Sequence, residues 1–136
     1  MSIEHGELRA AVATCMDFRF QELIDSWIKE NNLYGQHDRI AVAGAAGDLE
    51  SVYPQIELSI KLHGTIEVHV INHQNCGYYG NSVDSGSTAE HKKHSEDLGI
   101  LRSKIQDQFP EVKFFGYFAT LDEEGKAKSI EAVEIS

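Results

Sequence analysis

The sequence predicts an α/β fold of three layers, in which helices cover both faces of a mainly parallel sheet. Short apolar runs alternate with amphipathic segments along the chain, and only a short turn separates the last two apolar runs. Parallel strands need crossover helices, whereas a tight turn joins antiparallel strands. We therefore expect a mainly parallel sheet with strand 5 antiparallel at the C-terminal edge. The order we expect for the other strands is 2-1-3-4, one of the usual orders of such sheets. The length of 136 residues suits one domain, residues 1–136.

The first half of the chain is predicted to hold two strands and two helices. Apolar runs at residues 8–14 and 39–43 indicate buried strands. Residues 20–32 and 49–63 carry apolar side chains three or four positions apart, which is typical of amphipathic helices. Pro54 fits the second helix only in its first turn, and Gly64 is suited to end that helix.

The second half continues the alternation. It predicts a strand at 66–71, a loop at 77–87, a helix at 88–109, a strand at 112–119 and an edge strand at 128–135. Glu67 and His69 would share one face of the third strand and could satisfy each other there. His91 and His94 lie on the polar helix, where we expect a solvated face, although they could also bind a metal or shuttle protons.

Composition excludes several classes of function. The chain has 22 acidic and 12 basic residues and a formal charge of −10, so it would repel nucleic acids and anionic membranes but not a small neutral substrate. No apolar run approaches the roughly 20 residues that cross a bilayer, and residues 1–7 are too polar for a targeting signal, so we expect a cytoplasmic protein. Two cysteines are too few for a disulfide framework and suit a reduced compartment.

Two thiols and an imidazole are predicted to meet at one edge of the sheet. Cys15 follows the first strand, and His73 and Cys76 follow the third. The carboxyl ends of neighbouring parallel strands lie together, and two sulfurs with one nitrogen suit Zn²⁺ with a fourth position left open for catalysis. The alternatives are a small buried Cys15 with His73 as a capping residue and Cys76 as a loop thiol, or a disulfide between the two cysteines.

These residues resemble a known family. Cys15, Asp17 and Arg19, spaced as Cys-x-Asp-x-Arg, are followed about sixty residues later by His73, Cys76 and Gly77, spaced as His-x-x-Cys-Gly. This pair of motifs is similar to the zinc signature of the β-class carbonic anhydrases. Residues 62–68 and 46–47 are similar to segments between the family's two motifs, so that the specific resemblance covers residues 12–77, about half of the chain.

The resemblance implies a function and a role for each matching residue. Cys15, His73 and Cys76 would bind Zn²⁺, whose bound hydroxide would convert CO₂ reversibly to bicarbonate. Asp17 would orient the hydroxide and Arg19 would hold Asp17 away from the zinc; if the pair opened, Asp17 could become the fourth ligand. Pairing at a helix N-terminus, with no catalytic role, is the alternative for Asp17 and Arg19. Three further residues would line the substrate pocket: Gly47, Gly77 and Tyr78.

The sequence departs from the pattern of that family at three places. The turn after the second strand usually has Arg-Asn-Ala-Gly, whereas residues 44–47 are Gly-Ala-Ala-Gly, so both polar side chains are missing. About seven residues precede the first strand, where family members usually carry N-terminal helices that wrap a partner subunit. The chain also stops soon after the fifth strand. A homodimer or higher homo-oligomer is still expected, but it would use another surface.

The departures leave other functions open. The same zinc site could hydrolyse COS or CS₂, which are linear triatomic molecules like CO₂. A noncatalytic zinc-binding or regulatory domain would keep the ligands without turnover, although it would not need the pair of Asp17 and Arg19. A nucleotide-binding module built on residues 44–47 ranks last, because the turn has neither a Gly-x-Gly-x-x-Gly pattern nor a Walker lysine.

Overall fold

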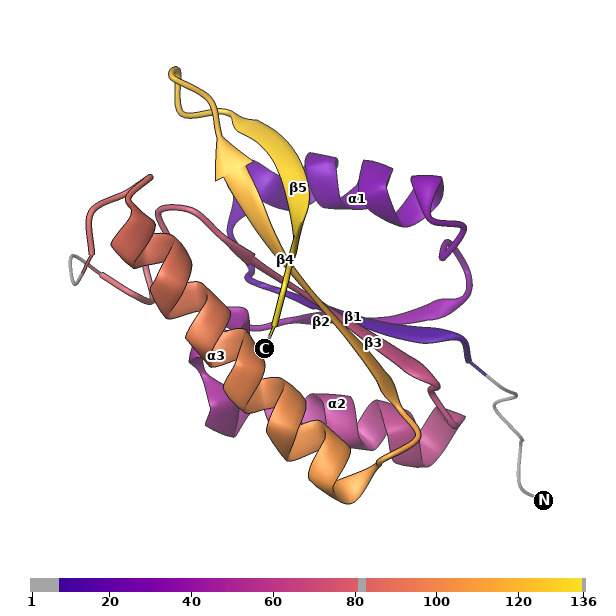
Figure 1. Ribbon diagram of the computed structural model, residues 1–136. Helices are drawn as coiled ribbons and strands as arrows, with labels where there is room; N and C mark the ends of the chain where they lie inside the picture. Colours follow the sequence, from indigo (N-terminus) through magenta and orange to yellow (C-terminus); the bar gives the residue numbers. More distant parts are fainter. Residues whose placement is uncertain (1–7, 81–82, 136) are drawn as a thin grey trace.

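The computed structural model describes residues 8–80 and 83–135, and all five strands lie in one sheet. The strands are β1 (Ala10–Thr14), β2 (His37–Ala41), β3 (Glu67–His73), β4 (Lys113–Leu121) and β5 (Ala127–Val133). Their order is β2-β1-β3-β4-β5, with β5 antiparallel to β4 and the other pairings parallel (Figure 1). The predicted order and the antiparallel edge strand are confirmed. The polar segment 1–7 and residues 81–82 of the predicted loop lie outside the described residues.

Helices cover both faces of the sheet, as predicted. Helix α1 (Gln21–Glu30) lies on one face, and α2 (Leu49–His63) and α3 (Thr88–Gln108) lie on the other (Figure 1). Each face has its own apolar core, and all five residues of β1 are buried between the two cores. Within the described residues, no helix is both long enough and apolar enough to cross a membrane.

Helix α2 begins and ends at residues suited to those positions. The Asp48 carboxylate accepts a hydrogen bond from Ser51 N at 3.3 Å, and Gly64 follows the helix in the left-handed conformation, with φ of 66°. The prediction for Pro54 was wrong, because it lies in the second turn rather than the first. Its missing N–H leaves the carbonyl of Glu50 without its helical partner, and both residues are exposed, so water can take that place.

Helix α3 buries a stripe that is apolar at one end and polar at the other. Leu98, Leu101 and Ile105 are fully buried, as the periodicity predicted. The stripe continues one turn at a time to His94 and Glu90, which are only 1% and 3% exposed. The expectation of a solvated face was therefore wrong for His94, because this turn lies against the sheet, whereas His91 is exposed.

The fold brings the carboxyl ends of β1 and β3 together. Thr14, the last residue of β1, is in register with Ile71 of β3, so Cys15 and His73 leave the same edge of the sheet. Two short 3₁₀ helices, η1 (Phe18–Phe20) and η2 (Ala45–Gly47), follow β1 and β2 at that edge. The other predicted polar pair is also confirmed: His69 Nε2 lies 3.1 Å from Glu67 Oε1, and its Nδ1 lies 2.8 Å from the Tyr117 hydroxyl.

Candidate metal centre

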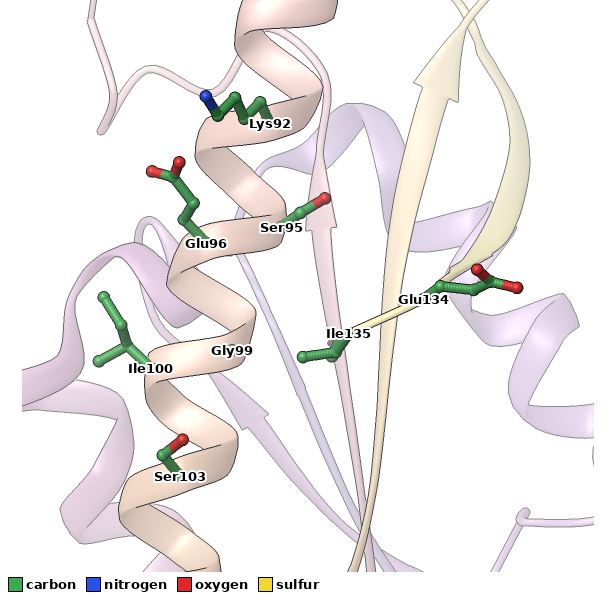
Figure 2. A pocket seen from close by; sticks show the side chains of 8 residues that line it. All are labelled: Lys92, Ser95, Glu96, Gly99, Ile100, Ser103, Glu134 and Ile135. Atoms are coloured by element: carbon green, nitrogen blue, oxygen red, sulfur yellow. The ribbon is translucent and has the colours of Figure 1, made fainter.

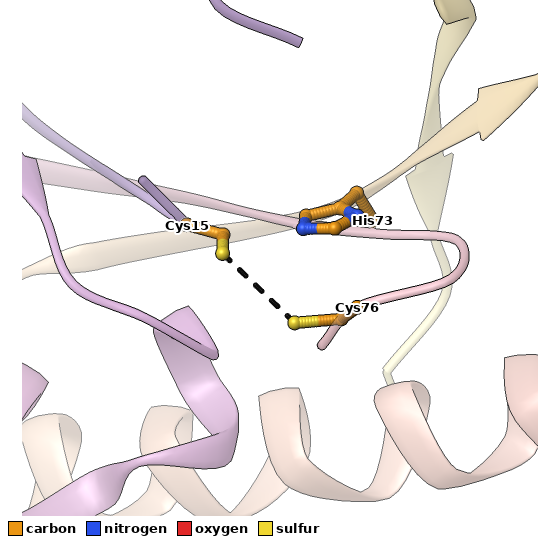
Figure 3. Close-up of side chains that lie close together, drawn as sticks. All are labelled: Cys15, His73 and Cys76. Carbon is orange, nitrogen blue, oxygen red and sulfur yellow. Dashed lines mark hydrogen bonds between the residues drawn. The ribbon is translucent and has the colours of Figure 1, made fainter. Parts of the chain in front are cut away.

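Three potential metal ligands meet where β1 and β3 end. Cys15, His73 and Cys76 are all buried, and their potential ligand atoms lie within 4.8 Å of one another (Figure 3). The two sulfur atoms are 3.9 Å apart. Both cysteines are free, and this separation is far beyond the roughly 2 Å of a disulfide bond. The structure thus brings together the three residues that the sequence predicted would meet.

The geometry of the three donors fits a zinc ion. Two sulfurs bound to tetrahedral zinc at about 2.3 Å lie about 3.8 Å apart, close to the separation observed here. His73 Nδ1 lies 2.7 Å from the Gln74 carbonyl oxygen, which can only accept, so Nδ1 carries the proton. Nε2 is then left with a lone pair, and it is buried without a hydrogen-bond partner among the described residues. A hydrogen-bonded Nδ1 and a free Nε2 are what a metal-binding histidine needs.

The two thiols share a strongly asymmetric environment. The hydrogen bond from the Cys76 thiol lowers the pKa of Cys15 well below its usual range, and the nearby His73 and the Gly44 N–H, 3.5 Å from the sulfur, act in the same direction. The same hydrogen bond, together with burial, raises the pKa of Cys76. One thiolate is therefore stabilised before any metal binds, and a dication would favour ionisation of both.

Neighbouring side chains fix the position of the ligands. The Gln21 amide donates to the carbonyls of Cys15 and Asp17, at 3.2 and 2.8 Å. Arg39 of β2 donates to Gln21 Oε1 and to Thr14 Oγ1, both at 2.7 Å, which ties the loop after β1 to the sheet. The Phe20 ring packs on the His73 imidazole with ring centres 4.4 Å apart. The ligands are thus held by a frame of hydrogen bonds and packing.

Asp17 and Arg19 form a bidentate pair beside the centre. Arg19 Nη2 donates to Asp17 Oδ2 at 2.7 Å, and Arg19 Nε donates to Oδ1 at 3.1 Å. These hydrogen bonds hold the pKa of Asp17 below its usual value. Asp17 also caps η1 by accepting from Arg19 N at 2.9 Å, so the capping interaction and the ion pair coexist. Asp17 Oδ2 lies 3.8 Å from His73 Nε2, which places this carboxylate at the metal centre.

The turn after β2 packs directly against the tyrosines that follow Cys76. A Cβ atom on Gly44 would lie 2.6 Å from the Tyr78 ring, and one on Gly47 would lie 2.7 Å from the Tyr79 ring. Tyr78 therefore occupies the space in front of Gly44, one of the two positions at which the sequence lacks a polar side chain, and Tyr79 packs on Gly47. Gly77 faces open space. Of the three predicted pocket residues, Tyr78 and Gly47 lie in this packed wall and Gly77 lies at an open position.

Sequence reasoning missed a buried polar network behind the centre. The Asn72 side chain accepts from Ala46 N at 3.1 Å and donates to the Tyr79 hydroxyl at 3.1 Å and to His94 Nδ1 at 2.9 Å. The Tyr79 hydroxyl donates to Asp97 at 2.6 Å. Burial lowers the pKa of His94 to about 4. Asn72 therefore supplies a polar contact to the turn, which lacks polar side chains of its own. An asparagine directly after the apolar run at 66–71 was the signal for it.

The cavities lie apart from the three donors. A groove of about 640 Å³ runs along the outer side of α3 beside Glu134 and Ile135, and it contains none of the predicted site residues (Figure 2). A second groove of about 500 Å³ lies between α1 and the turn that joins β4 to β5, and Arg19 forms part of its wall. Of these two grooves, the second adjoins the candidate metal centre through Arg19.

Comparison with known proteins identifies the family. Residues 6–131 match a protein family described as "Putative carbonic anhydrase". The chain belongs to this family. Similar sequences include uncharacterized proteins from Rickettsia bellii, 25% identical and covering 86% of this chain and 79% of the relative, and from Rickettsia conorii, 24% identical and covering 86% and 70%. The predicted resemblance to the carbonic anhydrases is thereby confirmed.

A solved structure supports the fold of this carbonic anhydrase family member. The crystal structure of carbonic anhydrase from Streptococcus mutans superposes with a TM-score of 0.64, over 95% of this chain and 83% of that chain. The two sequences are only 16% identical over this match. At this identity the match shows that the sheet and helices have the same arrangement.

Proposed function

We propose that this protein is a zinc-dependent enzyme that hydrates CO₂ reversibly to bicarbonate. The observation that carries the proposal is the buried set of two sulfurs and one imidazole nitrogen with an ion-paired carboxylate beside it. The three side chains Cys15, His73 and Cys76 would hold the zinc. Three protein ligands leave a fourth position for water, which is typical of catalytic zinc and not of structural zinc.

The chemistry divides between the metal and the protein. A bound zinc ion supplies hydroxide near neutral pH by acidifying a coordinated water. Because two thiolates cancel the charge of the dication, this effect is weaker than at a site of three neutral histidines. Asp17 Oδ2 would accept a hydrogen bond from the nucleophile and aim its lone pair at the carbon of CO₂. Arg19 keeps Asp17 ionised and in place for this task.

Stopped-flow measurement of CO₂ hydration tests the proposal. The reduced, zinc-loaded protein should exceed the rate of buffer alone. Asp17→Ala should keep its zinc, because Asp17 is outside the ligand set, yet lose about a hundredfold in kcat, the usual contribution of a positioned acid–base group. A wild-type rate equal to that of buffer would disprove CO₂ hydration. In that case sulfide release from COS would instead assign the site to COS hydrolysis.

The proposal extends to the assembly and the compartment. Met16 and Phe18, next to the centre, are 65% and 86% exposed, and such apolar side chains would be covered by a second subunit. We therefore propose a homodimer, located in the cytoplasm because the site needs reduced thiols. Light scattering that gave the mass of one chain at micromolar concentration would contradict the dimer.

A further inference from the structure

The loop between two of the ligands contains a residue that contacts Arg19 on the side away from Asp17. Asn75 has φ of 58°, a left-handed conformation that asparagine tolerates better than most residues. Its Oδ1 accepts from Arg19 Nη1 at 3.0 Å, and its carbonyl oxygen accepts from Arg19 Nη2 at 2.9 Å. The guanidinium is thus held between Asp17 and Asn75.

A buried carboxylate holds Asn75 in turn. Glu90, in the first turn of α3, accepts from Asn75 N at 2.8 Å through Oε2 and from Gly86 N at 2.9 Å through Oε1. Burying a carboxylate is costly unless it is hydrogen-bonded, and here each oxygen accepts a backbone N–H, while the helix N-terminus favours the negative charge. The hydrogen bonds to the Glu90 carboxylate thus fix the loop that carries His73, Asn75 and Cys76.

The Arg19 side chain could adopt another position if its hydrogen bonds to Asn75 were lost. Its side chain forms part of the wall of the open groove of about 500 Å³ between α1 and the turn after β4. Glu22 also lines this groove and could pair with a released guanidinium. Asp17 Oδ2 is already 3.8 Å from His73 Nε2, so a small rotation would bring the freed carboxylate onto a metal held there.

We propose that Asn75, held in place by Glu90, is a positioning residue that keeps Arg19 on Asp17 and so keeps the Asp17 carboxylate off the metal. The inference rests on the proposed function, because the open fourth position matters only at a metal-loaded site. The inference gives Asn75, an x position of the His-x-x-Cys motif, the task of holding Arg19. It gives Glu90, fifteen residues further along the chain, the task of holding Asn75.

A matched pair of variants separates the side chain from the backbone turn. Asn75→Gly keeps the left-handed backbone and the carbonyl acceptor but removes Oδ1, whereas Asn75→Asp keeps an acceptor oxygen in the same place. Crystal structures of the metal-free variants should show Arg19 turned into the groove in the glycine variant and still on Asp17 in the aspartate variant. An unchanged pair of Asp17 and Arg19 in Asn75→Gly would overturn the inference.

Azide binding to the cobalt(II)-substituted protein, followed by visible absorption, tests the consequence at the metal. Asn75→Gly should bind azide about tenfold more weakly than the wild type, because a conformation closed by Asp17 lowers the open fraction, while cobalt content stays at one per chain. Asn75→Asp should restore wild-type affinity. Wild-type affinity in the glycine variant would contradict the inference.

Two further results keep the test decisive. If Asn75→Gly fails to fold, Glu90→Gln takes its place in the test. Glutamine has the same size as glutamate but only one acceptor oxygen, so we expect it to bind azide as weakly as Asn75→Gly should. Wild-type azide affinity in Glu90→Gln would refute the role of Glu90. A wild-type protein that takes up no metal would overturn the proposed function instead. The metal-free crystal structures would still decide whether Asn75 holds Arg19.

Discussion

At the scale of single residues, Gly44 shows why the turn after β2 is built from small residues. It has φ of 86°, which disfavours any side chain, and a Cβ there would also meet the Tyr78 ring at 2.6 Å. Gly64 has a similar φ of 66°, but a Cβ there would meet nothing within 4 Å. A side chain at Gly64 would therefore incur only the cost of the left-handed backbone conformation. A side chain at Gly44 would incur that cost and the cost of steric overlap with Tyr78.

Alanine at each of these two glycines measures that difference. We expect Gly64→Ala to lower the free energy of unfolding by about 1 kcal/mol, the conformational cost alone. Gly44→Ala should lower it by about 1–3 kcal/mol more, because Tyr78 must move. Urea denaturation of the metal-free proteins gives both values. Equal losses of unfolding free energy in the two variants would mean that the Tyr78 side chain moves aside without an energetic cost.

Residues within the two motifs were predictable, and the residues that support them were not. Cys15, His73 and Cys76 could be paired because each follows a strand whose end reaches the same edge. Asn75 and Glu90 could not, because their contact depends on a loop conformation and on how deeply the first turn of α3 is buried. The helical spacing puts Glu90 on the inner face of α3, but no pattern in the sequence predicts that its carboxylate accepts hydrogen bonds from Asn75 N and Gly86 N.

At the scale of elements, α3 shows both the reach and the limit of the sequence pattern. The spacing of Leu98, Leu101 and Ile105 predicted the buried face correctly. Extending the same spacing by steps of four reaches His94 and then Glu90, so the burial of both followed from geometry although their polarity pointed to solvent. The burial of His94 is possible because Asn72 donates to its Nδ1 and the Tyr79 ring packs 3.9 Å from its ring centre.

This burial predicts a pH-dependent contribution of α3 to stability. The folded pKa of His94 is about 4, below the roughly 6.5 of an unfolded histidine, so the unfolded state takes up the proton first. The stabilising contribution is therefore complete above pH 6.5 and is lost as the pH falls toward 4. Between pH 7.5 and 5.5 the expected loss is about 1 kcal/mol.

Comparison with a histidine on the exposed side of α3 isolates this effect. His94→Gln should reduce the pH dependence of unfolding by that amount in metal-free protein, and the same substitution at the exposed His91 is the matched control on this helix. Urea unfolding at the two pH values gives the comparison. An identical pH dependence in wild type and His94→Gln would show that His94 is not held neutral in the folded protein.

At the scale of the whole molecule, the strand order was predictable and the filling of the site was not. The alternation of strands and helices leaves few ways to build one parallel sheet, and in the predicted order 2-1-3-4, which the structure confirms, β1 and β3 are neighbours. The sequence showed that the turn after β2 lacks two polar side chains, but not what lies in front of it. That Tyr78 and Tyr79 lie there depends on the path of the loop after Cys76, which local sequence does not determine.

The metal should join the two halves of the fold. Cys15 follows the first strand and Cys76 follows the third, 61 residues later, so the predicted ligands come together only in the folded chain. A ligand that binds only the native state, at a free concentration one hundred times its dissociation constant, stabilises it by about 2.7 kcal/mol. We therefore expect removal of zinc by a chelator under reducing conditions to lower Tm by roughly 10 °C.

Cys15→Ser is the control: by metal analysis it should hold well under one zinc per chain, and its Tm should not respond to the chelator. If the wild type lost its zinc with no change in Tm, the metal would not be coupled to folding; if Cys15→Ser kept a full zinc, Cys15 would not be a ligand.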